Sequence, residues 1–223
     1  TAVLLPRARP QPSDGASGPG GRRLSLLSWG RYVEYFARPE LGSLLYQFFA
    51  FAFAFAAFIS GFALFAERRL FWHGAPFGAK EVGYVFAFSG FLGIILQGGL
   101  IGRMVKRFGE VRLTRWGFAS FSVSYAMLAV VHRIPELLGS ATLSSFGQAA
   151  LRPALTAQIT HNSRRDEQGL VLGITQSLTA VGQIIAPILT GFLIGHELIG
   201  AWALMAGAAA AIGLALNLRQ KVV

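Results

Sequence analysis

The acidic side chains of this sequence, which are the groups most often used for proton chemistry, avoid its apolar segments. Six long apolar runs fill the chain between Leu44 and Asn217, and all ten Asp and Glu residues lie outside them. A carboxylate inside such a run would be the default candidate for a proton relay or an ion-coupling site. The runs therefore contain no carboxylate that could carry a proton through an apolar medium.

Arg152 is the one charged residue that lies well inside an apolar run. A charge at the centre of a membrane helix costs about 2.5 kcal/mol or more. Two interpretations are open: the guanidinium extends toward the loop with Asp166 and Glu167, which we favour, or it makes an anion or gating contact. Pro153 and, in the following run, Pro187 each remove a backbone hydrogen bond and are predicted to kink their helices.

Uncharged polar residues also occur within the runs, where their hydrogen-bonding groups need partners. Each one either bonds to a neighbouring helix or faces a water-filled cavity. Gln176 and Gln183 are seven residues apart and therefore share one face of a helix. The set comprises Gln47, Ser60, Gln97, Ser124, Tyr125, Gln148, Gln176 and Gln183.

The motifs of the common enzyme classes are missing from the sequence. It has no H-E-x-x-H pair for a metal and no G-x-S-x-G turn for a serine nucleophile. None of Lys80, Lys106 and Lys221 follows a Walker loop, and without Cys there are no disulfides or thiolate metal sites. We expect no catalytic residues, no bound metal and no cofactor.

The composition assigns the apolar runs to lipid. The chain of 223 residues is 53% hydrophobic and only 13% charged, whereas soluble domains carry about 25% charged residues. Each run is close to the ~20 residues that cross the hydrocarbon layer as a helix. Because the loops are short, consecutive spans are expected to be antiparallel neighbours. The predicted spans are 44–66, 82–102, 113–131, 137–160, 169–194 and 198–217.

The first span contains an alternation of phenylalanine and alanine from Phe49 to Phe55, which would also suit a β-strand. A lipid-facing barrel strand alternates apolar with polar residues over ~10 positions. Here both faces are apolar and the run is about twice that length. The sequence therefore predicts a helix.

The segment before the first span has two parts. Residues 1–22 are rich in Pro, Gly, Ser and Arg and are expected to form a linker. Aromatic and charged residues between Leu24 and Ala37 predict a short interfacial helix that ends near Pro39, with an ordered loop as the alternative. The chain starts at Thr1 without a signal-peptide pattern, so we expect it to be cut from a longer one.

The basic residues are distributed unevenly between the two sides of the predicted spans. Most of the 20 Lys and Arg residues lie in the N-terminal segment, in the loops after the second and fourth spans, and in the tail. Cytoplasmic loops carry the excess of basic residues. We therefore expect both termini in the cytoplasm, and we attribute the net charge of +10 to membrane orientation and not to nucleic acid.

The loop after the second span places glycines around a basic cluster, with Gly102, Lys106, Arg107, Gly109 and Glu110 at fixed spacing. This resembles the signature loop of the major facilitator superfamily, G-x-x-x-D-R-x-G-R. Gly102, Arg107 and Gly109 match that pattern. Lys106 stands at its acidic position and Glu110 at its final basic position, a degeneration that is usual in the second copy of the loop.

Other stretches resemble the tetracycline-efflux-like, drug:proton antiporter branch of that family. Residues 48–67 are similar to its seventh helix, and residues 151–177 to its tenth and eleventh. The resemblance implies an all-α membrane fold with six transmembrane helices, which form the C-terminal half, an inverted 3+3 repeat, of a twelve-helix transporter. Its first, fourth and fifth spans would line the substrate cavity, which singles out Gln47, Gln148 and Gln176.

The resemblance also implies domains, partners and a location. Residues 1–43 would be the central cytoplasmic linker, 44–218 the transmembrane bundle and 219–223 a cytoplasmic tail. The partners would be the lipid bilayer, the N-terminal six-helix half of the same transporter, a small-molecule substrate and protons, with the coupling carboxylate in the absent half. No nucleic acid is expected.

The expected function is export of small amphipathic or drug-like compounds by alternating access in a bacterial inner membrane. The alternative is a non-transporting six-helix membrane scaffold or partner protein. Charged residues at the cytoplasmic end are predicted to form an ion-pair latch, with a solvated rim as the alternative. This cluster comprises Lys106, Arg107, Glu110, Arg164, Arg165, Asp166 and Glu167.

Overall fold

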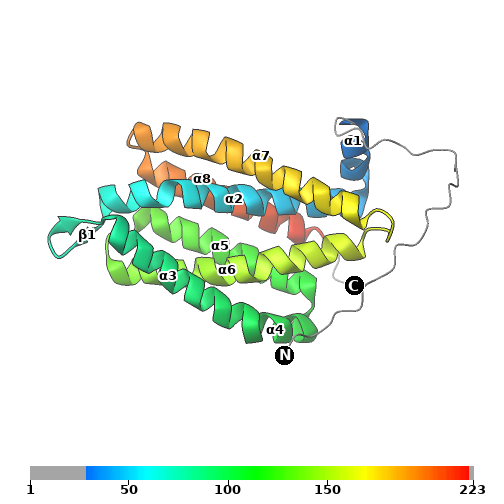
Figure 1. Ribbon diagram of the computed structural model, residues 1–223, viewed down its shortest axis with the longest axis horizontal. Coiled ribbons are helices and arrows are strands. Elements are labelled where there is room, and N and C mark those ends of the chain that lie inside the picture. Colours follow the sequence, from blue (N-terminus) through cyan, green and yellow to red (C-terminus); the bar gives the residue numbers. More distant parts are fainter. Residues whose placement is uncertain (1–28, 221–223) are drawn as a thin grey trace, which may run out of the picture.

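The computed structural model describes residues 29–220, which form a bundle of long helices (Figure 1). The short helix α1 (Trp29–Ala37) runs across one end of this bundle and not along it. It ends just before Pro39, the first residue of α2, as the sequence predicts for a short helix in this segment. The predicted linker 1–22 lies outside the described residues.

Each predicted span falls on a long helix. The helices are α2 (Pro39–Arg69), α3 (Ala79–Ile95), α4 (Ile101–Phe108), α5 (Glu110–Val130), α6 (Ile134–His161), α7 (Gln168–Gly195) and α8 (Ile199–Leu218). The π-helical turn η1 (Leu96–Leu100) joins α3 to α4, so Ala79–Phe108 is one rod of 30 residues.

Four of these rods are long and apolar enough to cross a membrane: α2, the α3–α4 rod, α7 and α8. The helices α5 and α6 have 21 and 28 residues, which is sufficient length, but a more polar composition. Their polar residues include serines and threonines that bond to backbone carbonyls one turn away, such as Ser122 to Phe118 and Thr142 to Leu138. All six predicted spans are therefore helical in the structure.

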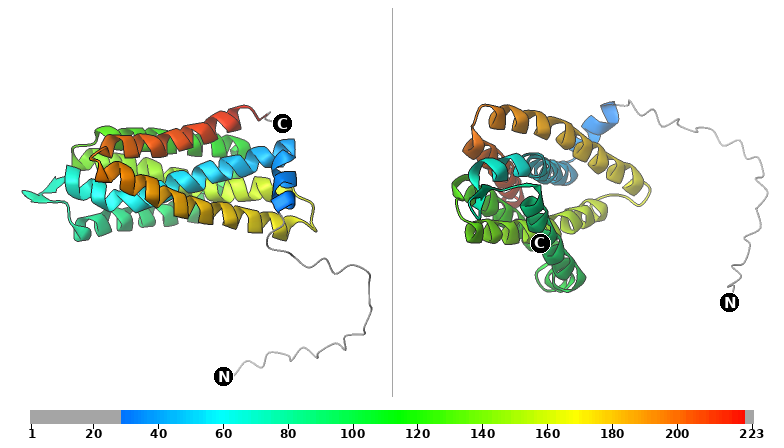
Figure 2. Two further views of the ribbon diagram at one scale, coloured as in Figure 1. Left: turned by 90° about the horizontal axis from the view of Figure 1, so that it is seen from above. Right: turned by 60° about the vertical axis from the view of Figure 1, so that its left-hand side comes forward.

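A small antiparallel hairpin between α2 and α3 is the one element in residues 29–220 that is not helical. Its strands are β1 (Phe71–Trp72) and β2 (Ala75–Pro76), and it projects from the end of the bundle opposite α1 (Figures 1 and 2). His73 and Gly74 both have positive φ, 50° and 84°, and close the turn.

Arginines at the end of α2 tie this end of the bundle together. The Arg68 guanidinium donates a hydrogen bond of 2.7 Å to the carbonyl oxygen of Ile194, near the end of α7. Arg69 donates one of 3.2 Å to Val131, just after α5. Helix carboxyl ends carry unsatisfied carbonyl groups and a partial negative charge, so both contacts are favourable.

The contacts between helices follow a regular pattern. The helix α2 packs against α7 and α8, and α5 packs against α6 and α8, whereas α3 packs chiefly against α6. Consecutive helices such as α2 and α3, or α6 and α7, touch over only a few residues. The expectation that sequence neighbours are spatial neighbours is therefore wrong for these pairs.

The same pattern has an internal symmetry. Exchanging α2, α3 and α5 with α6, α7 and α8 maps the α2–α8 contact onto α5–α6 and the α2–α7 contact onto α3–α6. The first residue of α2, Pro39, and the residue after α8, Arg219, line one hollow. The beginning of α2 and the end of α8 therefore lie at the same end of the bundle. Each set of three helices buries its apolar surface mainly against the other set.

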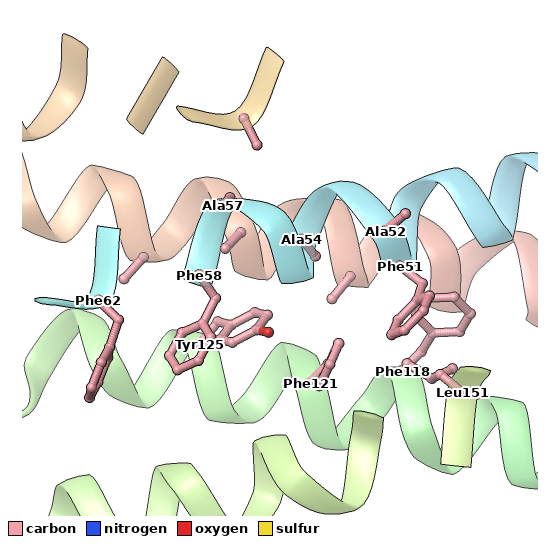
Figure 3. Close-up of a cluster of buried hydrophobic side chains, with 14 of the residues drawn as sticks. Phe51, Ala52, Ala54, Ala57, Phe58, Phe62, Phe118, Phe121, Tyr125 and Leu151 are labelled. Carbon is pink, nitrogen blue, oxygen red and sulfur yellow. The ribbon is translucent and has the colours of Figure 1, made fainter. Parts of the chain in front are cut away.

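Aromatic side chains fill the centre between α2 and α5 (Figure 3). The rings of Phe58 and Tyr125 stack with centroids 5.5 Å apart, and those of Phe51 and Phe121 stack at 5.9 Å. Offset stacking of this kind adds to the energy of burial. Phe51 belongs both to this core and to the wall of the candidate site, so the core positions that wall.

Candidate functional site

A hollow of about 660 Å³ lies between α2, α6 and α7. Its volume is within the range of cavities that hold small molecules. The three helices contribute different chemistry, because α2 supplies aromatic and aliphatic residues with Ser60 as its one polar residue, whereas α6 and α7 supply most of the polar side chains. Among the hollows described for residues 29–220, this one combines the largest apolar wall with convergent polar groups.

The apolar wall consists of Phe48, Phe51, Phe55 and Ile59 on α2. These residues recur at spacings of three and four, so they occupy one side of the helix. Ala52 and Ala56 lie between them and leave depth beside the rings. Such a surface suits the flat apolar part of a ligand.

The polar wall is formed by two rows of side chains. Gln148, Arg152 and Thr156 are spaced four residues apart along α6, and Gln176, Thr179 and Gln183 form a matching row on α7. Residues at this spacing share a helix face. The sequence candidates Gln148, Gln176 and Arg152 are therefore brought together across the hollow.

The groups of this wall differ in what they can offer a ligand. The Thr156 hydroxyl donates to the Arg152 carbonyl oxygen at 2.8 Å, and the Thr179 hydroxyl donates to Thr175 at 2.9 Å. Within residues 29–220, the side chains of Gln148, Arg152 and Gln176 have no hydrogen-bond or ion-pair partner. Together with the amide of Gln183, which also has no such partner in the described residues, these groups are the wall's available donors.

Gln148 also borders a second, smaller hollow of about 390 Å³ between α2, α3 and α6. Phe55 and Ile59 line both spaces, so the two hollows adjoin along α2 and α6. Gln97, another polar residue of the predicted spans, lines the second one.

Gln47 does not lie at either hollow. It is fully buried, and its amide oxygen accepts a hydrogen bond of 3.2 Å from Asn217 on α8 while its amide nitrogen donates to Ser43. Arg115 donates to the same Asn217 at 3.3 Å. Gln47 therefore has the interhelical role that the sequence left open as the alternative for each of these polar residues.

The signature loop is a tight reversal between α4 and α5. Gly109 has φ 80° and ψ 162°, a conformation that residues with a side chain rarely adopt. The Arg107 guanidinium lies over the Phe108 ring at 5.3 Å, and Glu110 is 3.4 Å from His161 at the end of α6. Lys106 and Gly102 lie on α4, and both are exposed.

The acidic residues of the predicted ion-pair latch pair partly within that cluster and partly with residues outside it, and its role as a latch stays a prediction. Glu167 binds Arg38 through two hydrogen bonds, of 2.9 and 3.1 Å, and Asp166 pairs with its neighbour Arg164 at 3.5 Å. Arg38 lies between α1 and α2, so Glu167 attaches the α6–α7 loop to the short helix. Neither acid pairs with Arg152, which is directed to the hollow.

The ionisation of this contact follows from its geometry. Hydrogen bonding by the Arg38 guanidinium lowers the pKa of Glu167 below its ordinary value. Tyr35 on α1 is buried beside the pair, and burial, with the nearby Glu167 carboxylate, raises its pKa. The contact is therefore charged at neutral pH.

The two prolines lie inside α6 and α7, and both helices continue past them. Pro187 lines the hollow, and Pro153 follows Arg152 directly. Kinking at these positions stays a prediction.

In residues 29–220 there is no cluster of three or more acidic or histidine residues suited to a metal.

Sequence reasoning missed three residues that hold this arrangement together. They are Arg38, which pairs with Glu167, Asn217, which donates to Gln47, and Trp202 on α8, whose indole nitrogen donates to the Ala57 carbonyl oxygen on α2. The sequence could have indicated Asn217, because an amide near the end of an apolar run needs a hydrogen-bond partner on another helix. Nothing in the local sequence indicates that α1 folds back onto the α6–α7 loop.

Comparison with known families decides the relationship. The model of the Major Facilitator Superfamily matches residues 77–221, more than half of the chain. The chain belongs to this superfamily. The predicted membership of the family is thus confirmed, whereas the assignment of the loop at Gly102–Glu110 to the superfamily signature stays a prediction.

Several relatives of this chain are drug-resistance proteins. Multidrug resistance protein 2 of Bacillus subtilis is 26% identical over 173 residues, which cover 78% of this chain and 42% of the relative. The class B tetracycline resistance protein of Escherichia coli is 29% identical over 60% of this chain and 32% of its own length. The quinolone resistance protein NorA of Staphylococcus aureus is 21% identical over 76% and 40%. The chain therefore spans about two fifths of the length of the multidrug resistance proteins 1 and 2 of Bacillus subtilis.

Proposed function

We propose that this chain is the C-terminal six-helix half of a twelve-helix secondary transporter. It would export small amphipathic or drug-like compounds by alternating access, and it would act as a transporter and not as an enzyme. The observation that carries this proposal is the hollow between α2, α6 and α7, in which an aromatic wall faces amides and a guanidinium. A cavity of mixed character suits compounds with one apolar and one polar part.

The exchange symmetry of the helix contacts supports the assignment to one half. An inverted repeat of three plus three helices predicts that α2–α8 and α5–α6 are equivalent contacts, as are α2–α7 and α3–α6. The match to two fifths of longer drug-resistance proteins agrees with a second half elsewhere in the polypeptide. We take α5 and α6 to cross the membrane as well, with their polar groups turned to other helices.

The distribution of charge supports an orientation with both ends in the cytoplasm. The end of the bundle that carries α1 also carries Arg107, Arg115, Arg164 and Arg219, whereas Lys80 and Arg133 are among the few basic residues near the opposite end. Basic residues accumulate on the cytoplasmic side. On this view α1 lies in the headgroup layer, and the protein resides in a bacterial inner membrane.

Transport would follow from movement of the whole bundle against the missing half. The hollow would be the share of a midplane cavity that this half contributes, opened to each side in turn. Residues lining the hollow include no Asp or Glu. We therefore place the proton-coupling carboxylate in the N-terminal half.

Efflux measurements on the full-length protein test this function. Cells that express it should accumulate less ethidium or tetracycline than cells without it, and a proton uncoupler should abolish the difference. Gln176→Trp fills part of the hollow and should lower efflux at least tenfold, because the indole occupies the space of the substrate. Equal accumulation with and without the protein, for every compound in a susceptibility panel, would favour the scaffold interpretation.

Ile212→Trp is the matched control. It introduces the same bulky side chain on α8, at a position that is 60% exposed and does not line the hollow. Efflux by this variant should equal that of the wild type. If both variants lose efflux equally, the hollow is not the substrate site.

A further inference from the structure

Arg152 gives the hollow a charge preference that drug export by itself does not require. We propose that its guanidinium binds the anionic group of an aromatic substrate, so that the transporter accepts aromatic carboxylates and related anions. This inference rests on the proposed function, because it names the class of compound that enters the same hollow.

The position of Arg152 along its helix carries the first step. It precedes the last residue of α6, His161, by nine residues, which corresponds to ~14 Å at 1.5 Å per residue. A guanidinium stays charged under all ordinary conditions. At that depth in a membrane helix, a charge needs a partner or a water-filled space and marks a functional position.

The second step concerns the counter-charge. Residues lining the hollow include no carboxylate, and in residues 29–220 the two nearest acids in sequence are already paired, Glu167 with Arg38 and Asp166 with Arg164. Both of those pairs lie at the loop between α6 and α7. An anion that neutralises Arg152 would therefore have to come from outside residues 29–220.

The third step is the shape of the surroundings. Gln148 lies one helical turn from Arg152 on α6, and Gln176 lies on α7 across the hollow, so amide donors flank the guanidinium. Phe48 and Phe51 on α2 form the facing wall. A flat ring placed on this wall would direct its carboxylate to Arg152, whose planar fork can bind both oxygens.

Two sources could supply such a carboxylate, a substrate or another part of the full-length protein. The chemistry at Arg152 is the same in both cases, but the consequences differ. If the substrate supplies it, only anionic ligands depend on Arg152. If the protein supplies it, ligands of every charge depend on Arg152 alike.

Binding of three matched probes to the purified full-length protein separates these cases. The probes are 2-naphthoate, the neutral 2-naphthamide and the cationic 2-naphthylmethylammonium, titrated at pH 7.5 by calorimetry. The wild type should bind naphthoate at least about tenfold tighter than naphthamide, since hydrogen bonds to charged groups are the stronger ones. Arg152→Gln should abolish this ratio, and Arg152→Lys, which keeps the charge without the fork, should retain part of it.

Arg103→Gln is the control for loss of a positive charge, because Arg103 is exposed on α4 and does not line the hollow. It should keep the full ratio. Equal affinity of the wild type for naphthoate and naphthamide would overturn the proposal, as would a ratio that survives in Arg152→Gln. Equal weakening of all three probes by Arg152→Gln would assign the carboxylate to the protein and also overturn it.

The outcome for the proposed function can be read separately. Export of ethidium or tetracycline by a wild type that shows no preference for naphthoate would overturn the charge preference alone. Failure to export any compound, together with failure to bind any probe, would overturn the transporter assignment itself.

Discussion

The indole nitrogen of Trp202 donates a hydrogen bond of 2.9 Å to the backbone carbonyl oxygen of Ala57. The indole is fully buried, and it lies against Gly61 one turn further along α2. This contact joins α8 to α2, two helices that are far apart in sequence. This carbonyl group in the middle of α2, which also accepts a hydrogen bond of 3.1 Å from Ser60 on its own helix, is thus bonded by a residue of the other three-helix set.

Gly61 leaves the room that the indole occupies. A Cβ atom at this position would lie 2.5 Å from two indole atoms and 2.7 Å from the Thr190 methyl group. Gly61→Ala should therefore destabilise the bundle by about 1–3 kcal/mol, the usual cost of overpacking. Thermal unfolding of the detergent-solubilised protein measures this, and Gly83→Ala, which meets no atom within 4 Å, should leave the transition unchanged.

A pair of serines joins α5 to α6. The Ser124 hydroxyl donates to the Ser140 carbonyl oxygen at 2.8 Å, and the Ser140 hydroxyl donates to the Ser124 carbonyl oxygen at 2.9 Å. Ser124→Ala should lower stability by about 0.6 kcal/mol, and by no more than about 1.7 kcal/mol, the range for hydrogen bonds between membrane helices. In the exposed control Ser177→Ala, which loses only a bond to its own helix, the melting temperature should not fall.

The contact between Arg38 and Glu167 predicts a pH dependence for α1. Arg38 lowers the pKa of Glu167, so the contact is fully present above the ordinary pKa of a glutamate and is lost as the pH falls through the lowered value. Spin labels at Val33 and Arg165, both exposed, should give one narrow distance distribution between pH 6 and 8. The distribution should broaden as the pH falls through the lowered pKa of Glu167.

Glu167→Gln should broaden the same distribution already at pH 7, because a neutral amide binds the guanidinium less well. Asp166→Asn is the control: Asp166 is exposed and pairs only with Arg164 in the part of the chain described. A narrow distribution in Glu167→Gln at pH 7 would show that the ion pair does not hold α1.

The absence of Cys allows the site to be mapped with single cysteines. Gln176→Cys and Gln183→Cys should react readily with a charged methanethiosulfonate reagent, because both positions line the hollow and are exposed. Gln47→Cys should react at least tenfold more slowly, since Gln47 is fully buried. A Gln47→Cys variant that reacts as fast as Gln176→Cys would contradict the position of Gln47 between α2 and α8.

The helices could be located from the sequence because hydropathy marks them directly. The structure extends the first predicted span, 44–66, to Pro39–Arg69, since helices continue into polar residues such as Glu40 and Arg68. The β-hairpin was not predicted, although His73-Gly74 marks a turn. The helix contacts were predicted poorly, because short loops do not determine which helices pack together.

The candidate site was predictable only in part. Residues on α6 and α7 that combine amides with one charge, such as Gln148, Arg152 and Gln176, stand out against an apolar background. The orientation of Gln47 could not be predicted, because a helix that is apolar on every side does not reveal which face meets α8. The partner of Glu167 depends on the docking of α1, which is a tertiary contact without a local signal.

The exchange symmetry of the bundle has a consequence for its assembly. Because α2 is covered by α7 and α8, and α6 by α5 and α3, neither consecutive triplet encloses its own interior. The docking surfaces of α2, α3 and α5 are therefore covered only when α6, α7 and α8 are in place. We therefore expect a polypeptide severed between Val130 and Ile134 to yield two sets of helices that form the bundle only when both are present.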